Sequence, residues 1–267
     1  ARACASAARC PTRLVGAFPG AFCRVEAAGD GAAALALADG RRVALRLAVP
    51  GRHNLDNAAC AIAAAEWCGV PLEEAAARLA AFAGVGRRFE ERGTAAGVRV
   101  VDDYAHHPTE LRATLAAARE GHGGRLVAVF QPHLYSRTRA LWRELGAALG
   151  AADLAIVTDV YAAREAPDPT VSGRLVADAV PPPARARFAP TLADASAALL
   201  AEVRSGDLVL TLGAGDVTGL GQELLAALQK VSDDERHHRD GARETGPPRP
   251  DAAPPEREDG HARAPAA

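Results

Sequence analysis

The sequence predicts an α/β fold whose main part is a Rossmann-like, doubly wound and mostly parallel sheet. From Gly97 onward, short continuous apolar runs alternate with longer amphipathic segments, a pattern typical of strands and helices in βα units. Clusters of His, Asp and Arg follow directly after several of these apolar runs. Ligands of open parallel sheets bind at the carboxyl ends of the strands, so we expect the functional residues at that edge.

The composition favours a protein that binds a small charged molecule. The chain has 267 residues and a net charge of −2, so nothing indicates the strongly basic surface of a nucleic-acid-binding protein. No apolar run approaches the roughly 18 residues of a membrane span, and the N-terminus lacks a signal-like apolar segment. Five cysteines without a C-x-x-C pair are typical of a reducing compartment. We therefore expect a cytoplasmic protein without a nucleic-acid or membrane partner.

The first part of the chain predicts a small antiparallel sheet. Residues 1–11 show no clear period, and because the chain starts without Met we expect a further segment upstream. Asp39-Gly40 is the strongest turn signal, since this pair tolerates the positive φ angles of a two-residue hairpin. Strands are expected at Arg13–Glu26, Ala32–Ala38 and Arg41–Val49.

Two helices are expected after these strands. A Pro50-Gly51 turn precedes an Ala-rich segment that ends at Gly69, a suitable residue just past a helix end. A second helix is expected from Pro71 to about Phe82, after which AGVGRRFEERG breaks the pattern. We place a domain boundary there, so that residues 1–86 form one domain.

Residues 87–230 carry the alternating pattern of the predicted sheet, and residues 231–267 do not. The last segment holds six of the 18 prolines and only one large aliphatic residue, too little apolar surface to offset the entropy of ordering, so we expect a disordered tail. The expected strands are VRVVDDY, RLVAVFQ, DLAIVTDV, ARARFA and DLVLTLG, and helices are expected at Pro108–Glu120, Ser136–Gly150, Ser172–Val180, Leu192–Arg204 and Asp216–Gln229.

The start of the first long helix carries His53, Asn54 and Asn57. The two Asn residues are three apart, so their amides point the same way, and an amide donor and acceptor suit the edge of an adenine base. Helix capping, which Asn does well, is the alternative for these residues.

Arg87 and Arg88 lie in the irregular stretch between the two predicted domains, where a cleft would form. A guanidinium there would hold a phosphate and neutralise charge during phosphoryl transfer. A solvent-exposed Arg pair is an equally frequent outcome in a chain so rich in Arg.

The segment DDYAHHPTE follows the first strand of the predicted sheet. Strand geometry sends Asp102 and Asp103 to opposite sides, so that one is structural while the other faces the cleft and accepts from ribose hydroxyls. His106 or His107 would orient a substrate carboxylate or amine. A metal site is the rival hypothesis, although adjacent His residues lack the i, i+4 spacing that places two imidazoles on one metal.

FQPHLYSRT repeats this arrangement one βα unit later, with His133, then Ser136 as the expected N-cap, and Arg137 in the first turn. Two successive strand ends of this kind converge on one crevice. A third strand end supplies Tyr161, Arg164 and Glu165. The glycine-rich turn LGAGDVTGLG lacks the Gly-Lys-Ser/Thr ending of a phosphate loop, so we interpret its glycines as tight strand-to-helix packing.

The motifs GRHNLDNAACAIAAA, GVGRRFE, DDYAHHPTELRATLAAAR, FQPHLYSRT, VYAARE and LVLTLGAGDVTGLG together resemble the Mur ligase family. The resemblance covers about residues 40–230, and DDYAHHPTE with FQPH is its most specific part. Within the family, the motifs resemble members that join L-alanine to UDP-N-acetylmuramate in peptidoglycan synthesis. This resemblance implies a ligase that uses ATP and Mg²⁺ to phosphorylate the muramate carboxylate, after which the alanine amine attacks the acyl phosphate.

The resemblance also implies domains and roles. Residues 1–86 would end a central ATP-binding domain, and residues 87–230 would form the amino-acid-binding domain. Many family members have Arg where this chain has Leu134, so residue 134 is left out of the site. By position, the family assigns adenine contacts to His53, Asn54 and Asn57, a phosphate contact and catalysis to Arg88, the ribose contact to Asp103, the alanine and muramate side to Tyr104, His106, His133 and Arg137, and catalysis also to His106.

The family's Walker A loop and Mg²⁺ ligands have no counterpart in the sequence, which contains no Gly-Lys dipeptide. No metal ligand is therefore expected in this chain, and the chain alone is expected to be inactive, because positioned phosphate and metal supply most of the catalysis in phosphoryl transfer. The rival hypotheses are a recycling ligase that attaches a preformed peptide to the same sugar, a nucleotide- or amino-acid-binding module without catalysis, and a metal-dependent hydrolase.

Overall fold

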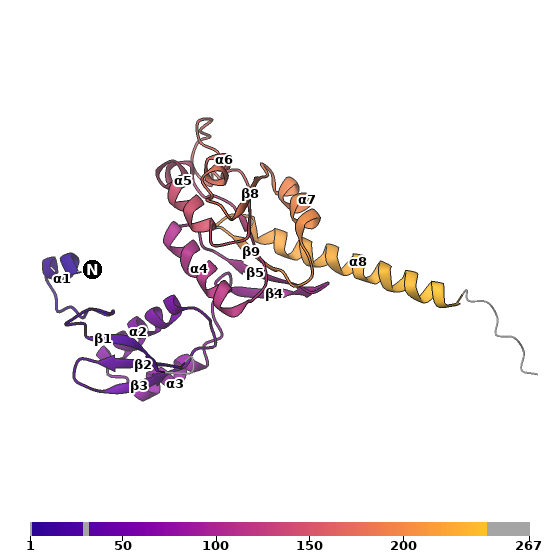
Figure 1. Ribbon diagram of the computed structural model, residues 1–267. Coiled ribbons are helices and arrows are strands. Elements are labelled where there is room, and N and C mark those ends of the chain that lie inside the picture. Colours follow the sequence, from indigo (N-terminus) through magenta and orange to yellow (C-terminus); the bar gives the residue numbers. More distant parts are fainter. Residues whose placement is uncertain (1, 29–31, 245–267) are drawn as a thin grey trace, which may run out of the picture. The chain divides into compact units, whose positions relative to one another are not determined.

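The computed structural model describes residues 2–28 and 32–244 of the chain. Its first part is a three-stranded antiparallel sheet in the order β1-β2-β3, covered by two helices (Figure 1). Buried apolar residues that include Leu35, Leu45, Ile62 and Leu72 form the core between sheet and helices. The elements are β1 Cys23–Ala28, β2 Ala32–Leu37, β3 Arg42–Leu45, α2 Arg52–Trp67 and α3 Leu72–Ala80.

This part contains the predicted hairpin, but it differs from the predictions in the hairpin's loop length, in the start of the first strand and in an additional short helix. The hairpin forms where it was predicted, but its loop has three residues instead of two. The Leu37 N–H donates to the Arg41 carbonyl at 2.9 Å and Ala36 pairs with Arg42, so residues 38–40 form the loop and Gly40 supplies the positive φ, 88°, that such a loop requires at its last residue. The predicted strand Arg13–Glu26 is wrong before Cys23: residues 13–22 contribute only an isolated bridge at Val15, because the chain turns repeatedly there. The segment without a clear period contains a short helix, α1 Arg2–Ala7.

The second part is a six-stranded sheet in the order β4-β5-β9-β6-β7-β8. Every strand pair is parallel except β4 with β5, which confirms the predicted mostly parallel sheet. β9, the last strand in sequence, lies between β5 and β6, so strand ends from distant parts of the chain meet. The strands are β4 Glu90–Ala95, β5 Val98–Asp103, β6 Leu126–Phe130, β7 Leu154–Val157, β8 Arg185–Phe188 and β9 Leu208–Leu212.

Helices cover both faces of this sheet (Figure 1). One apolar layer joins the sheet to α4, α5 and α6, and a second joins it to α7 and α8. Val100 and Val101 of β5 belong to different layers, as the alternation of side chains along a strand dictates. The helices are α4 Pro108–Gly121, α5 Tyr135–Leu149, α6 Gly173–Asp178, α7 Leu192–Glu202 and α8 Thr218–Glu244.

Two elements differ from the predictions. The edge strand β4 lies in the polar segment EERGTA, which was expected to be irregular; it has one neighbouring strand, antiparallel β5, and a register shift between Glu91 and Gly93, so it needs no continuous apolar run. Helix α8 continues to Glu244, beyond its predicted end at Gln229, because no proline occurs before Pro247. Residues 245–267 of the predicted disordered tail lie outside the described residues.

Within the described ranges, no helix combines the length and apolar character that a membrane crossing requires.

Candidate functional site

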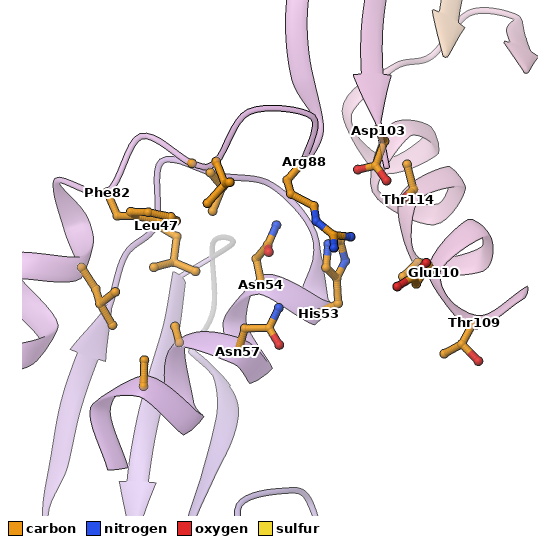
Figure 2. A pocket seen from close by; sticks show the side chains of 17 residues that line it. Leu47, His53, Asn54, Asn57, Phe82, Arg88, Asp103, Thr109, Glu110 and Thr114 are labelled. Atoms are coloured by element: carbon orange, nitrogen blue, oxygen red, sulfur yellow. The ribbon is translucent and has the colours of Figure 1, made fainter. Parts of the chain in front are cut away.

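A cavity of about 650 Å³ brings together five of the residues singled out in the sequence. His53, Asn54 and Asn57 lie on one side, on α2, and Asp103 lies beside α4 on the other, with the Arg88 side chain between the two sides in this view (Figure 2). The complete lining is Leu47, Val49, His53, Asn54, Asn57, Ala58, Ala61, Leu79, Phe82, Gly84, Val85, Arg88, Asp103, Thr109, Glu110, Ala113 and Thr114.

The polar residues on α2 do not cap the helix in the way the alternative requires. Gly51 occupies the N-cap position with φ 97° and no side-chain cap. A Cβ there would lie 2.8 Å from the His53 ring and 2.9 Å from the Ala117 side chain, so only glycine fits. The Asn54 amide donates to the Pro50 carbonyl at 2.6 Å, which leaves its oxygen available as an acceptor.

The cavity also has an apolar wall that solvent reaches. Phe82 is 42% exposed and Val85 is 60% exposed, and both line the cavity with Leu47 and Val49. Exposed apolar side chains beside amide and imidazole groups suit a flat ligand with a polar edge, because the faces of such a ligand bury apolar area while its edge forms hydrogen bonds.

The structure separates the two neighbouring arginines. The Arg87 guanidinium donates to the Asp102 carboxylate at 3.1 Å and to the Gly213 carbonyl at 2.7 Å, so it is engaged inside the protein. The exposed Arg88 guanidinium lines the cavity and has no hydrogen bond or ion pair with any residue that the structure describes. It lies 5.5 Å from the centroid of the Tyr104 ring, and its charge acts on the carboxyl groups of Asp103 and Glu110. Arg88 is therefore the cation available to an anionic ligand.

Asp102 and Asp103 lie on opposite sides of β5, as predicted from the strand period. Asp102 is fully buried and accepts hydrogen bonds from the hydroxyls of Thr211 and Thr218 at 2.6 and 2.8 Å. Asp103 is 4% exposed and accepts from the backbone N–H of Ala105 at 2.8 Å while lining the cavity. Burial raises the pKa of Asp103, and the backbone N–H groups it accepts from act in the opposite direction.

The side chains of the two adjacent histidines make different contacts. The His107 ring accepts from the Thr109 N–H, and Glu110 completes a capping box at the start of α4. The His106 Nδ1 atom lies 2.9 Å from the Tyr104 carbonyl oxygen. Among residues 2–28 and 32–244, no group of three or more His, Cys, Asp or Glu is placed to hold a metal ion, so the hydrolase hypothesis gains no support.

A second cluster gathers at the carboxyl ends of β5, β6 and the segment after β7. The ring centroids of Tyr104 and His106 are 5.4 Å apart, those of His106 and His133 are 5.9 Å apart, and those of His133 and Tyr161 are 5.7 Å apart. Arg137 lies in the first turn of α5, with its guanidinium 3.4 Å from the His133 Nδ1 atom. The structure thus brings together all four residues predicted for the second ligand.

The surroundings of His133 favour the neutral form of its imidazole. Burial lowers its pKa, and the positive charge of Arg137 and the neighbouring His106 lower it further. A neutral imidazole offers one donor and one acceptor, so it can receive a proton or a hydrogen bond from an incoming amine.

Comparison with known proteins gives relatives that belong to one family. Residues 87–215 match the family described as "Mur ligase, glutamate ligase domain". The chain is 57% identical over 220 residues to UDP-N-acetylmuramate–L-alanine ligase of Kineococcus radiotolerans. The chain belongs to the Mur ligase family.

The curated Mur ligases that match this chain are longer than it is. The match covers 81% of the chain and 47% of the Kineococcus radiotolerans protein. The UDP-N-acetylmuramate–L-alanine ligase of Saccharopolyspora erythraea is 54% identical over 195 residues, which cover 72% of the chain and 40% of that protein. The chain therefore spans less than half the length of these relatives.

Two solved Mur ligase structures share the fold. UDP-N-acetylmuramate-alanine ligase from Thermotoga maritima superposes with a TM-score of 0.67 at 26% identity, covering 82% of this chain and 48% of that one. A murein peptide ligase from Psychrobacter arcticus gives a TM-score of 0.62, also at 26% identity, over 81% of this chain and 46% of that one.

The structure of this Mur ligase chain adds one residue to the candidate site and corrects another. Tyr161 stacks on His133 with an angle of 21° between the rings; its position after a third strand was the only sequence signal. Ser136, predicted as the N-cap of α5, lies inside the helix, and Leu134 occupies the cap position with φ 71°. The Ser136 N–H and hydroxyl both donate to Glu165, so a carboxylate from a distant loop caps this helix.

The glycine-rich turn after β9 serves packing in this Mur ligase chain. A Cβ on Gly213 would lie 2.8 Å from the Gln131 carbonyl oxygen, and one on Gly215 would lie 2.2 Å from the Gln131 amide oxygen. The Gln131 side chain in turn donates to Asp216 at 2.7 Å. The glycines therefore allow β9 and α8 to pack closely against the loop that carries His133.

Proposed function

We propose that this chain is the C-terminal part of an ATP-dependent ligase that joins L-alanine to the carboxylate of UDP-N-acetylmuramate. The observation that carries the proposal is the cavity that gathers His53, Asn54, Asn57, Arg88 and Asp103 beside a second cluster of His and Tyr rings. Three relatives at 54–57% identity carry the name of this ligase. Within the proposal, residues 1–86 complete a central ATP-binding domain and residues 87–230 form the amino-acid-binding domain.

In the first cluster, the residues suit the parts of a nucleotide. The amides of Asn54 and Asn57 face an adenine edge, and Phe82 offers apolar contact to a base face. Asp103 accepts from ribose hydroxyls, and the unpaired Arg88 guanidinium contacts the phosphates. Arg88 would thus stabilise the charge that develops when a phosphoryl group moves from ATP to the muramate carboxylate.

Mg²⁺, which the family resemblance implies, has no fitting ligand set among the described residues. We therefore assign no residue of this chain to the metal and derive no step through it. Its ligands are expected in the part of the relatives that this chain does not cover.

In the second cluster, the residues suit an amino acid. The Arg137 cation pairs with a carboxylate. His133, whose surroundings favour the neutral imidazole, and the neighbouring His106 are the groups that we assign to accept the proton that the ammonium must lose before its nitrogen attacks the acyl phosphate. The new amide bond forms as the phosphate leaves, so both clusters must hold their ligands at the same time.

An assay of a chimera tests this proposal. The segment of the Kineococcus radiotolerans relative that precedes the matched region is joined to this chain, and phosphate release from ATP is measured with UDP-N-acetylmuramate. Release is expected to depend on L-alanine and to fall at least about 100-fold in the Arg88→Ala variant. Preference for a tripeptide over L-alanine would instead indicate the peptide-recycling ligase. Nucleotide binding without phosphate release would indicate a binding module.

A further inference from the structure

The segment that carries Arg88 has an unusual backbone conformation. Arg87 has φ 59° and Phe89 has φ 50°, so two non-glycine residues in the left-handed region flank Arg88. Side chains with a Cβ avoid this region unless the surrounding structure imposes it. The position of Arg88 is therefore determined by whatever holds its two neighbours.

Arg87 is held by contacts to three separate parts of the chain. Its backbone N–H donates to the Glu90 carboxylate at 2.7 Å. Its guanidinium donates to Asp102 at the end of β5 and to the carbonyls of Gly213 and Gly215 after β9, at 3.1, 2.7 and 3.3 Å. The side chain of Arg87 thus forms hydrogen bonds at the ends of both β5 and β9. A guanidinium can do this because its N–H groups point in several fixed directions, whereas a lysine ammonium is a single compact charge.

The end of β5 holds the same segment at two further points. The Phe89 N–H donates to the Asp103 carboxylate at 2.8 Å. The Tyr104 N–H donates to the Arg87 carbonyl at 2.7 Å. Three consecutive residues, 102–104, therefore contact the residues on either side of Arg88.

Arg88 itself takes no part in these bonds through its side chain, because none of the hydrogen bonds or ion pairs among the described residues involves the Arg88 guanidinium. A flexible exposed side chain usually loses binding energy when a ligand immobilises it. The backbone on both sides of Arg88 is fixed, so the side chain has fewer conformations in the free protein. It therefore loses less conformational entropy when a ligand binds it.

We propose that Arg87, locked to Asp102, is a positioning residue that sets the place of Arg88 for the phosphates of the nucleotide. The inference rests on the proposed function, because it assigns the phosphate contact to Arg88. Arg87 does not touch the nucleotide; it acts through the backbone of the next residue.

The test compares Arg87→Lys and Arg87→Met with the unchanged chain. The dissociation constants of ATP and of adenosine are measured by calorimetry, and amide hydrogen exchange is followed at Phe89 and Tyr104. Arg87→Lys keeps the charge and loses the fork, so an effect of charge alone would leave this variant unchanged. Arg99→Met is the matched control, because Arg99 pairs on the same sheet with the exposed carboxylate of Glu91 at 3.1 Å.

Both Arg87 variants are expected to raise the dissociation constant of ATP about tenfold, because the Arg88–phosphate hydrogen bond would be misplaced. The dissociation constant of adenosine, which has no phosphate, is expected to change little. Exchange at Phe89 and Tyr104 is expected to rise in the same variants and to stay unchanged in Arg99→Met. Equal losses for ATP and adenosine, or unchanged exchange, would overturn the inference. If the unchanged chain binds neither compound, the proposed nucleotide site fails, and the exchange data alone then decide whether Arg87 holds the segment.

Discussion

Asp102 and Asp103 are consecutive residues whose carboxylates face two different environments. The Asp102 carboxylate is fully buried and accepts hydrogen bonds from Thr211, Thr218 and Arg87. Asp103 lines the cavity. One strand end therefore supplies both an internal anchor and a cavity group, and the two can be tested separately.

Replacing Asp102 with Ala is expected to lower the free energy of unfolding by about 3 kcal/mol. The variant leaves the partly buried Arg87 cation without its carboxylate and the Thr218 hydroxyl without its acceptor. The Thr211 hydroxyl keeps only its longer bond, to the Val101 carbonyl at 3.4 Å. Urea denaturation measures this change. Glu91→Ala, which removes a 54% exposed carboxylate from the same sheet, should change stability by less than about 0.5 kcal/mol. Equal effects of the two substitutions would contradict a structural role for Asp102.

Asp103 is expected to titrate above the ordinary Asp value of about 3.9, because burial raises its pKa. The folded state then keeps a proton that the unfolded state has already lost. Stability therefore falls as the pH rises from below about 3.9 through the raised pKa, relative to the Asp103→Asn variant. Carboxyl carbon chemical shifts report the pKa, and urea unfolding across the same pH range reports the stability difference. A pKa at or below the ordinary value would refute this expectation.

His133 is expected to titrate below the ordinary His value of about 6.5, because burial and then the Arg137 charge lower its pKa. The unfolded state binds the proton more readily, so stability is lost as the pH falls below about 6.5 toward the lowered pKa. Imidazole proton shifts provide the measurement. Arg137→Met should raise the pKa, whereas Arg143→Met, on the same helix over the Trp142 ring, should not. A shift of the same size in both variants would exclude a specific effect of Arg137.

Gly215→Ala is expected to disturb the ring stack of the second cluster. Its Cβ would lie 2.2 Å from the Gln131 amide oxygen and 2.8 Å from the Tyr161 ring, so the expected loss of stability is about 1–3 kcal/mol. Gly219→Ala is the matched control, because nothing lies within 4 Å of its Cβ, and it should stabilise helix α8 by up to about 1 kcal/mol. Thermal unfolding and the aromatic proton spectrum of Tyr161 distinguish the two. An undisturbed Tyr161 spectrum in Gly215→Ala would contradict the packing described.

Much of the fold could be predicted because the central strands are buried on both faces. Every residue of β6 and β9 is buried, and both strands are apolar throughout apart from Thr211. Such a run can be recognised in the sequence even when the neighbouring strands are unknown. β4 could not be found in this way. It is an edge strand with polar residues and a register shift, so its sequence shows neither a continuous apolar run nor a regular alternation of apolar and polar residues.

The distinction between Arg87 and Arg88 could not be predicted, because it depends on distant residues. Arg87 reaches the carbonyl of Gly213, which is 126 positions away in the sequence, and no local pattern indicates that contact. The cap of α5 could not be predicted for the same reason. Ser136 is a suitable N-cap by residue type, but the acceptor at this helix start is the Glu165 carboxylate from another loop. Long-range contacts of this kind come from the order of strands in the sheet.

Titration of the chain with ADP, followed by nuclear magnetic resonance of its side-chain amide and guanidinium groups, tests the central claim most directly. We expect saturable shifts at the amides of Asn54 and Asn57 and at the Arg88 guanidinium, with no shift at the Arg87 guanidinium, which is engaged with Asp102. Adenosine should shift the two amides without shifting Arg88. Shifts confined to the His106 and His133 cluster, or no saturable shift at any of these groups, would contradict a nucleotide site in this cavity.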